Sequence, residues 1–193
     1  MPGFLVAVAF SAAQACSPAA LADIKEASAR VQAFDLAGAV DHLRQQWARG
    51  CEDTQIAGLY LAGLFAAMEA YKQGGSAESL VPVRDAIAAL EKISGQAPGS
   101  AEIARLVLVA ASAAAQSERE EMGAFLMHAI AMESLQLAAG QPGAPVLSAL
   151  EVAGELWLQV HRFDEAHAAF ERAAQQVGTT PRIADGLARA VPR

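Results

Sequence analysis

The chain has 193 residues, of which 54% are hydrophobic and only 18% charged, and this composition argues against an intrinsically disordered protein. About a quarter of the residues are alanine, whereas β-branched and aromatic residues are sparse, which argues against an all-β fold. The formal charge of −7 opposes a general role in binding nucleic-acid phosphates. One helical domain is therefore expected.

The N-terminus has the features of an export signal. Residues 1–22 carry no charge, and residues 4–10 form an apolar run that is too short to span a bilayer. A small-x-small sequence, as read by signal peptidases, ends at Ala15, although no Lys or Arg precedes the apolar run. We expect residues 1–15 to be a signal peptide and residues 16–193 to form the mature domain in a bacterial periplasm or cell envelope. The alternative is an ordinary first helix in a cytoplasmic protein.

The only two cysteines are Cys16 and Cys51. In an exported protein they could pair, and a closed loop of about 35 residues would stabilise the fold by roughly 3–4 kcal/mol. An antiparallel hairpin of helices would bring the ends of that loop together. Two other interpretations stay open, namely two unrelated thiols, or a lipidated Cys16 at the start of the mature chain.

Glycine, proline and serine divide the rest of the chain into segments with helical periodicity. Ser17 and Ser76 are expected to start helices, and Ser117 with Glu120 matches a capping box. No alternating strand pattern interrupts the series. The expected helices cover approximately residues 19–32, 36–48, 56–71, 76–93, 103–114, 117–139, 146–160, 164–177 and 181–190.

These segments group into four helix pairs followed by a single helix. The second helices begin near residues 34, 76, 117 and 163, which gives a period of about 42 to 45 residues. The sequence thus predicts an all-α fold, an antiparallel helix-turn-helix solenoid of about four pairs with a C-terminal helix.

The stretch from Leu147 to Thr180 resembles a tetratricopeptide repeat. His161 departs from the family pattern at a turn where glycine is usual, and the expected proline comes late, at Pro181. The last helix looks like the first helix of a further repeat, so a partner or a second copy could cover its apolar face. The residues that carry the resemblance, and that are expected to pack the repeat, are Leu150, Ala153, Gly154, Trp157, Phe163, Ala166, Phe170 and Ala173.

No catalytic, cofactor-binding or metal-ligating pattern was found, so we expect a protein that is not an enzyme and needs no cofactor or metal. The resemblance implies that a protein or peptide partner binds in a concave helical groove. The corresponding stripe is polar and acidic, and a basic or polar partner would suit it better than an acidic one. Its residues are Ser148, Glu151, Glu155 and Gln159.

A second hypothesis is a carrier that holds an apolar small molecule between the long middle helices. The alanine- and glycine-rich faces of residues 56–71 and 103–114 motivate it.

Overall fold

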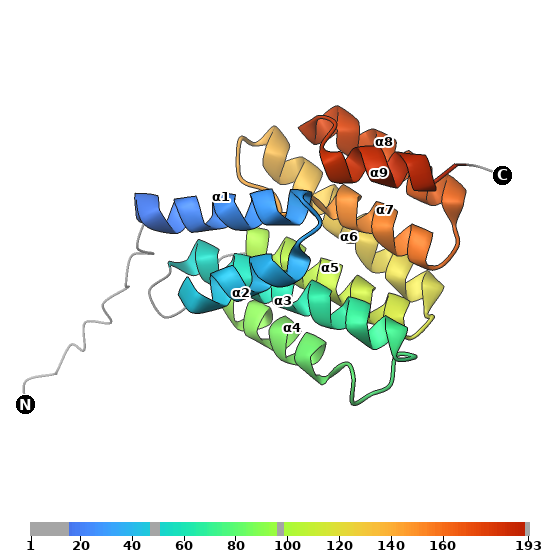
Figure 1. Ribbon diagram of the computed structural model, residues 1–193, viewed down its shortest axis with the longest axis horizontal. Helices are drawn as coiled ribbons and strands as arrows, with labels where there is room; N and C mark the ends of the chain where they lie inside the picture. Colours follow the sequence, from blue (N-terminus) through green and yellow to red (C-terminus); the bar gives the residue numbers. More distant parts are fainter. Residues whose placement is uncertain (1–15, 47–50, 96–98, 192–193) are drawn as a thin grey trace, which may run out of the picture.

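In the computed structural model, residues 16–46, 51–95 and 99–191 are described, and these ranges contain nine α-helices and no strand (Figure 1). The predicted all-α fold is confirmed. The predicted signal peptide, residues 1–15, lies outside the described residues. The helices are α1 (Pro18–Gln32), α2 (Leu36–Gln46), α3 (Glu52–Lys72), α4 (Val81–Ser94), α5 (Ser100–Ala115), α6 (Arg119–Ala138), α7 (Ala149–Gln159), α8 (Phe163–Val177) and α9 (Pro181–Arg189).

The helices associate as the four expected pairs. α1 packs on α2, α3 on α4, α5 on α6 and α7 on α8, while α9 packs on α8 and α7. The first helices of the pairs also contact one another in chain order, α1 with α3, α3 with α5 and α5 with α7. Among the described helices, none has both the length and the apolar character needed to cross a bilayer.

The turns inside the four pairs share one backbone geometry. Phe34, Ser117 and His161 have positive φ values of 64°, 65° and 61°, and glycines occupy the corresponding turn after α3. In each turn the following N–H donates to a carbonyl five residues earlier, as Arg162 does to Trp157 at 2.8 Å. This is the hydrogen bond that closes a helix end with a left-handed residue. The left-handed turn recurs about every 40 to 44 residues, close to the expected period.

The capping box predicted at Ser117 is wrong. Ser117 is left-handed because α5 ends only two residues before it, and Glu118 becomes the N-cap of α6 without a side-chain cap. The capping box forms instead at Ser148, whose hydroxyl accepts from the N–H of Glu151 at 3.2 Å while the Glu151 carboxylate accepts from the N–H of Ser148 at 3.1 Å. The same Ser-x-x-Glu spacing forms a cap at Ser148, whose own backbone is extended, and not at Ser117, whose backbone is left-handed.

The start predicted for the fourth helix also needs correction. Ser76 does not begin a helix, and α4 starts at Val81 with Pro82 in its first turn. The Ser76 hydroxyl accepts instead from the N–H of Ser79 at 3.2 Å, in a separate turn before the helix.

A main hydrophobic core extends from α1 to α8, and a smaller cluster joins α7, α8 and α9. In the smaller cluster the Phe170 ring packs between Gly154 and Gly186, where a Cβ on Gly154 would lie 2.6 Å from the ring. Ile183 on the inner face of α9 and Ala190 at its C-cap are fully buried. The last helix therefore does not expose the apolar face that the sequence predicts, because α7 and α8 cover it within the same chain.

The eight residues expected to pack the repeat lie at the α7–α8 interface or next to it. Trp157 and Phe163 are half-buried. The buried members of the set are Leu150, Ala153, Gly154, Ala166, Phe170 and Ala173.

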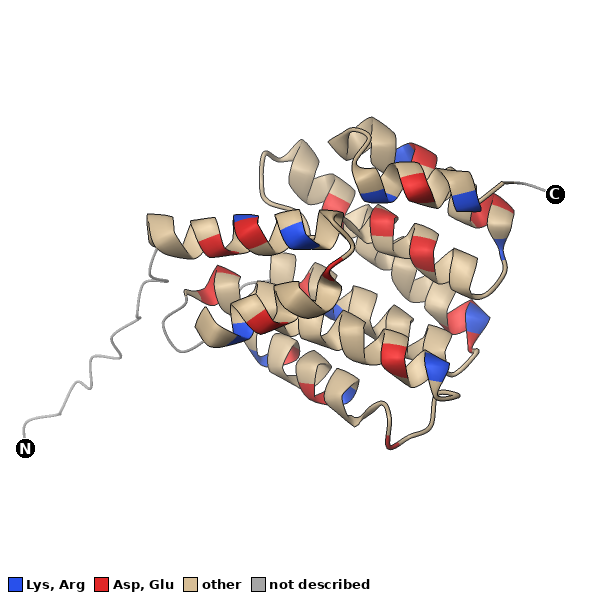
Figure 2. Cartoon of the chain, viewed as in Figure 1, with Lys and Arg blue, Asp and Glu red and all other residues tan. Residues whose placement is uncertain are grey.

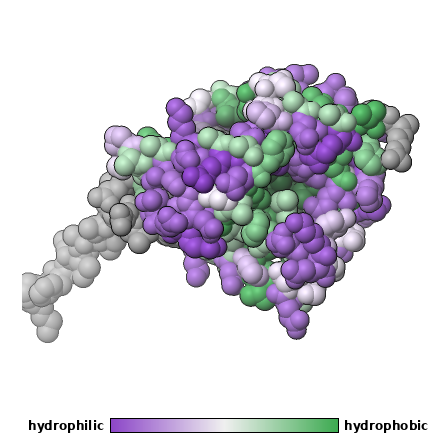
Figure 3. Space-filling model, viewed as in Figure 1, coloured by the Kyte–Doolittle hydropathy of each residue, from purple (hydrophilic) through white to green (hydrophobic). Residues whose placement is uncertain are grey.

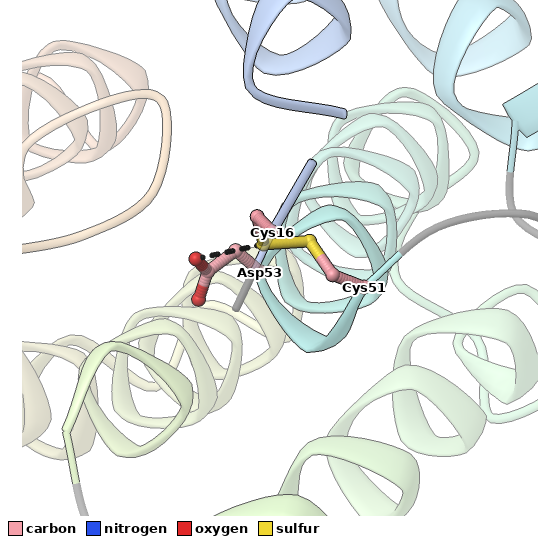
Figure 4. Close-up of side chains that lie close together, drawn as sticks. All are labelled: Cys16, Cys51 and Asp53. Carbon is pink, nitrogen blue, oxygen red and sulfur yellow. Dashed lines mark hydrogen bonds between the residues drawn. A yellow bond between two sulfur atoms is a disulfide. The ribbon is translucent and has the colours of Figure 1, made fainter. Parts of the chain in front are cut away.

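A disulfide joins Cys16 to Cys51, with their Cα atoms 5.2 Å apart (Figure 4). It connects Cys16, which precedes the Ser17 N-cap of α1, to the N-cap of α3 and so closes a loop that contains the α1–α2 pair. His42 Nε2 on α2 lies 3.4 Å from Asp23 Oδ1 on α1, which adds a contact between these two helices. Asp53 Oδ2 lies 3.1 Å from Cys16 Sγ, and because a disulfide sulfur has no proton to donate, this is a contact and not a hydrogen bond.

Candidate binding groove

A hollow of about 240 Å³ opens between α3, α7 and α9, with α1 and α2 on one side and α5 at its base. We call this hollow the groove. Its polar lining residues are Glu151, Glu155, Gln159, Arg182 and Arg189. Its apolar lining residues are Val31, Leu36, Leu64, Ala67, Met68, Ala111, Leu147, Val152, Leu156 and Leu158. Figure 3 shows this face hollowed, with apolar surface between hydrophilic rims.

The groove exists because small side chains line it where two long helices meet. Ala67 on α3 and Ala111 on α5 are nearly fully buried and lie at this place. One turn earlier on α3, Gly63 lets the Leu108 side chain approach so closely that a Cβ there would be 2.5 Å from it. The two faces of the carrier hypothesis therefore pack directly at Gly63, and the open space begins only beyond it.

Two tyrosines of α3 fix the position of the opposite wall, α7. The Tyr60 hydroxyl donates to the Leu147 carbonyl at 3.1 Å, and the Tyr71 hydroxyl donates to the Gln159 carbonyl at 2.9 Å. These carbonyls lie just before and at the end of α7, so α3 holds both ends of that helix. Burial raises the pKa of Tyr60 well above its usual value, which keeps the hydroxyl protonated as a donor.

The rim formed by α7 and α9 carries opposite charges on neighbouring helices (Figure 2). Glu155 Oε1 lies 2.6 Å from Arg189 and 3.4 Å from Arg182. Arg189 also contacts Asp185 at 2.7 Å. The short contacts of Glu155 and Asp185 thus go to Arg189, and Arg182 is left with one long hydrogen bond.

The N-terminal pair meets α9 and α7 beside the groove. The Arg182 guanidinium lies 5.5 Å from the centre of the Phe34 ring, within the range of a cation–π contact. Gln32 Nε2 donates to Glu151 at 3.3 Å. Phe34 is 53% exposed, and its backbone is left-handed, which is strained for a bulky residue. These contacts connect the first and last parts of the chain.

The four stripe residues have different surroundings. Ser148 and Glu151 are 8% and 5% exposed and bond to each other in the capping box, so they do not form an open stripe. Glu151, Glu155 and Gln159 line the groove, and Glu155 is paired with two arginines. The open acidic surface expected from the sequence is thus partly buried and partly neutralised.

Glu133 anchors the segment between α6 and α7. Its carboxylate is 2% exposed and accepts from the N–H groups of Ala144 and Ala149, both at 2.8 Å. Burial raises the pKa of Glu133, the negative charge of Glu151 raises it further, and the two N–H groups oppose the shift. This carboxylate lines a second hollow beside the groove wall and sets where α7 begins.

Within the described ranges, Cys16, Cys51 and Asp53 alone bring three metal-binding groups together. Both sulfurs belong to the disulfide, so neither can act as a thiolate ligand.

No family model, curated protein or solved structure matches this chain. The tetratricopeptide resemblance consequently rests on its own residues and stays a prediction.

Proposed function

We propose that this protein is a non-catalytic binding protein whose groove takes up the apolar part of a small ligand. The observation that carries the proposal is a hollow of about 240 Å³ in which ten of fifteen lining residues are apolar. Concave, mainly apolar sites with a few polar groups are the usual form of small-molecule sites.

Two contacts at the border of the groove favour a short occupant over an extended peptide. Phe34 contacts Arg182, and Gln32 donates a hydrogen bond to Glu151, so the α1–α2 pair is joined to α9 and α7 beside the groove. A peptide that continued past the groove towards α1 would meet these contacts, whereas a compact apolar group lies within the groove.

The absence of an enzyme activity is part of the proposal. Among the described residues that line the groove, there is no serine, cysteine or histidine. Glu155 is held by two arginines, and general-base or nucleophilic catalysis would need a free group.

A protein-interaction scaffold of the tetratricopeptide type is the second candidate. Phe34 and Met68, beside and within the groove, are 53% and 43% exposed. Large exposed apolar side chains around a hollow are typical of surfaces that a partner covers. A basic or polar peptide was the partner expected from the sequence, and the arginines on the rim weaken that preference.

The disulfide supports export to the periplasm or cell envelope. Disulfides persist in oxidising compartments and are rare in a reducing cytoplasm. Mass spectrometry of the native protein tests this proposal, because export predicts a mature N-terminus near Cys16, whereas an intact Met1 would contradict it.

Nuclear magnetic resonance with octan-1-ol tests the binding proposal. We expect saturable shifts at Leu64, Met68 and Leu156, and we expect Met68→Asp to weaken them by placing a charge in the apolar lining. Met127→Asp is the matched control, since Met127 is 70% exposed on α6 outside the groove. Shifts spread over the whole surface, or unaffected by Met68→Asp, would contradict the proposal.

A further inference from the structure

Among the charged side chains that line the groove, Arg182 makes the fewest hydrogen bonds. A guanidinium has five N–H donors, and most of those of Arg182 are free to bind a ligand. The Arg182 side chain is only 16% exposed, yet its one hydrogen bond is the 3.4 Å contact with Glu155 Oε1. The Phe34 ring covers part of the guanidinium at 5.5 Å without accepting a conventional hydrogen bond.

The two carboxylates of the groove, Glu151 and Glu155, already have close hydrogen-bond donors. Glu151 accepts from the N–H of Ser148 and from its hydroxyl, both at 3.1 Å, and from Gln32 at 3.3 Å. Glu155 has Arg189 at 2.6 Å. What the groove lacks is therefore an acceptor for Arg182, and a cation would find both carboxylates already bonded.

The size of the apolar part limits the ligand. At about 30 Å³ for each water-sized group, a hollow of about 240 Å³ holds roughly eight such groups. An unbranched chain of about eight carbons fills that volume.

We infer that the ligand of the groove is a single-chain carboxylic acid of about eight carbons, with its carboxylate on Arg182 and its chain along Leu64, Met68 and Leu156. The inference rests on the proposed function, which requires only an apolar group in the same place. A carboxylate accepts two parallel N–H bonds from a guanidinium, so it supplies the missing acceptors of Arg182.

Calorimetric titration of the full chain with octanoate, octan-1-ol and octylamine tests the inference, since the three probes share a chain and differ in the head group. We expect octanoate to bind about tenfold more tightly than octan-1-ol, as one charge-assisted pair predicts. Added salt should weaken octanoate binding and leave octan-1-ol binding unchanged. Equal binding of octanoate and octan-1-ol, or tighter binding of octylamine, would overturn the inference while leaving the proposed function standing.

Substitutions test whether Arg182 causes the tighter binding of octanoate. Arg182→Gln should reduce octanoate binding about tenfold and reduce octan-1-ol binding by a much smaller factor. Arg172→Gln, at an exposed position of α8 outside the groove, is the matched control and should change neither. Loss of octan-1-ol binding together with octanoate binding in Arg182→Gln would mean a structural role for Arg182 and would overturn the inference. If neither probe binds the unmodified chain, both the proposed function and this inference fail.

Discussion

The two ends of the described chain form facing walls of the groove, and they are attached to the middle helices by different means. The α1–α2 pair is connected to α3 by the disulfide of Cys16 with Cys51. The α7–α9 unit is held to α3 by hydrogen bonds from Tyr60 and Tyr71 to the two ends of α7, and its own helices pack around the Phe170 ring, which fits between two glycines. The attachment of the α1–α2 wall therefore depends on whether its disulfide is oxidised or reduced. The packing of the α7–α9 wall depends on Gly154 and Gly186, which have no Cβ.

Removal of the disulfide should have the largest effect. Cys16→Ser with Cys51→Ser frees a loop of 35 residues, and chain entropy predicts a loss of about 3–4 kcal/mol in the free energy of unfolding. Urea denaturation measures the loss, and hydrogen exchange should show faster opening of α1 and α2 than of α8. The unmodified chain with a reductant is the control and should behave like the variant. Equal stability of the oxidised and reduced chains would contradict the prediction.

Gly186→Ala tests the close packing inside the α7–α9 unit. A methyl group at this position overlaps the Phe170 ring, which Gly154 confines from the opposite side, so we expect a loss of about 1–3 kcal/mol. Thermal or urea denaturation measures it. In the background of Phe170→Leu the same substitution should cost less, because the ring that it meets is gone. Additive losses in the double variant would mean that Phe170 does not cause the effect.

Glu133 should make stability depend on pH through the segment that leads into α7. Its pKa is raised in the folded state, so its contribution to stability is full below the unfolded pKa and is lost as pH rises through the folded pKa. We expect Glu133→Gln to remove that part of the decline, which begins above about pH 4.3, the ordinary pKa of a glutamate, as measured by urea denaturation at each pH. An identical pH profile for both proteins would contradict the prediction.

Substitutions at the left-handed turns should have the smallest effect on stability. Because one turn belongs to each wall, they also allow the two walls to be compared. His161→Gly should stabilise the protein by about 0.5–1 kcal/mol, because glycine has no Cβ to strain at positive φ. Phe34→Gly should gain less, since it also removes the contact with Arg182. Thermal denaturation of the two variants tests the order. A larger gain at Phe34 would show that its ring contributes little to closing the groove.

The helix pairs could be predicted because glycine, proline and serine punctuate an otherwise periodic chain. The capping box at Ser117 could not be excluded in the same way, since only the short link after Ala115 forces a left-handed residue there. The sequence predicts only the part of the groove that α7 forms. Arg182 and Phe34 are about 150 residues apart in sequence and meet through tertiary packing, and no local pattern indicates such a contact.

The disulfide also changes the covalent topology of the molecule. Cys16 and Cys51 make α1, the turn at Phe34 and α2 part of a closed ring. A protease that cuts beside the exposed Phe34 opens the ring without dividing the molecule, because both new ends stay attached through sulfur. The nicked chain would separate into two pieces only after reduction.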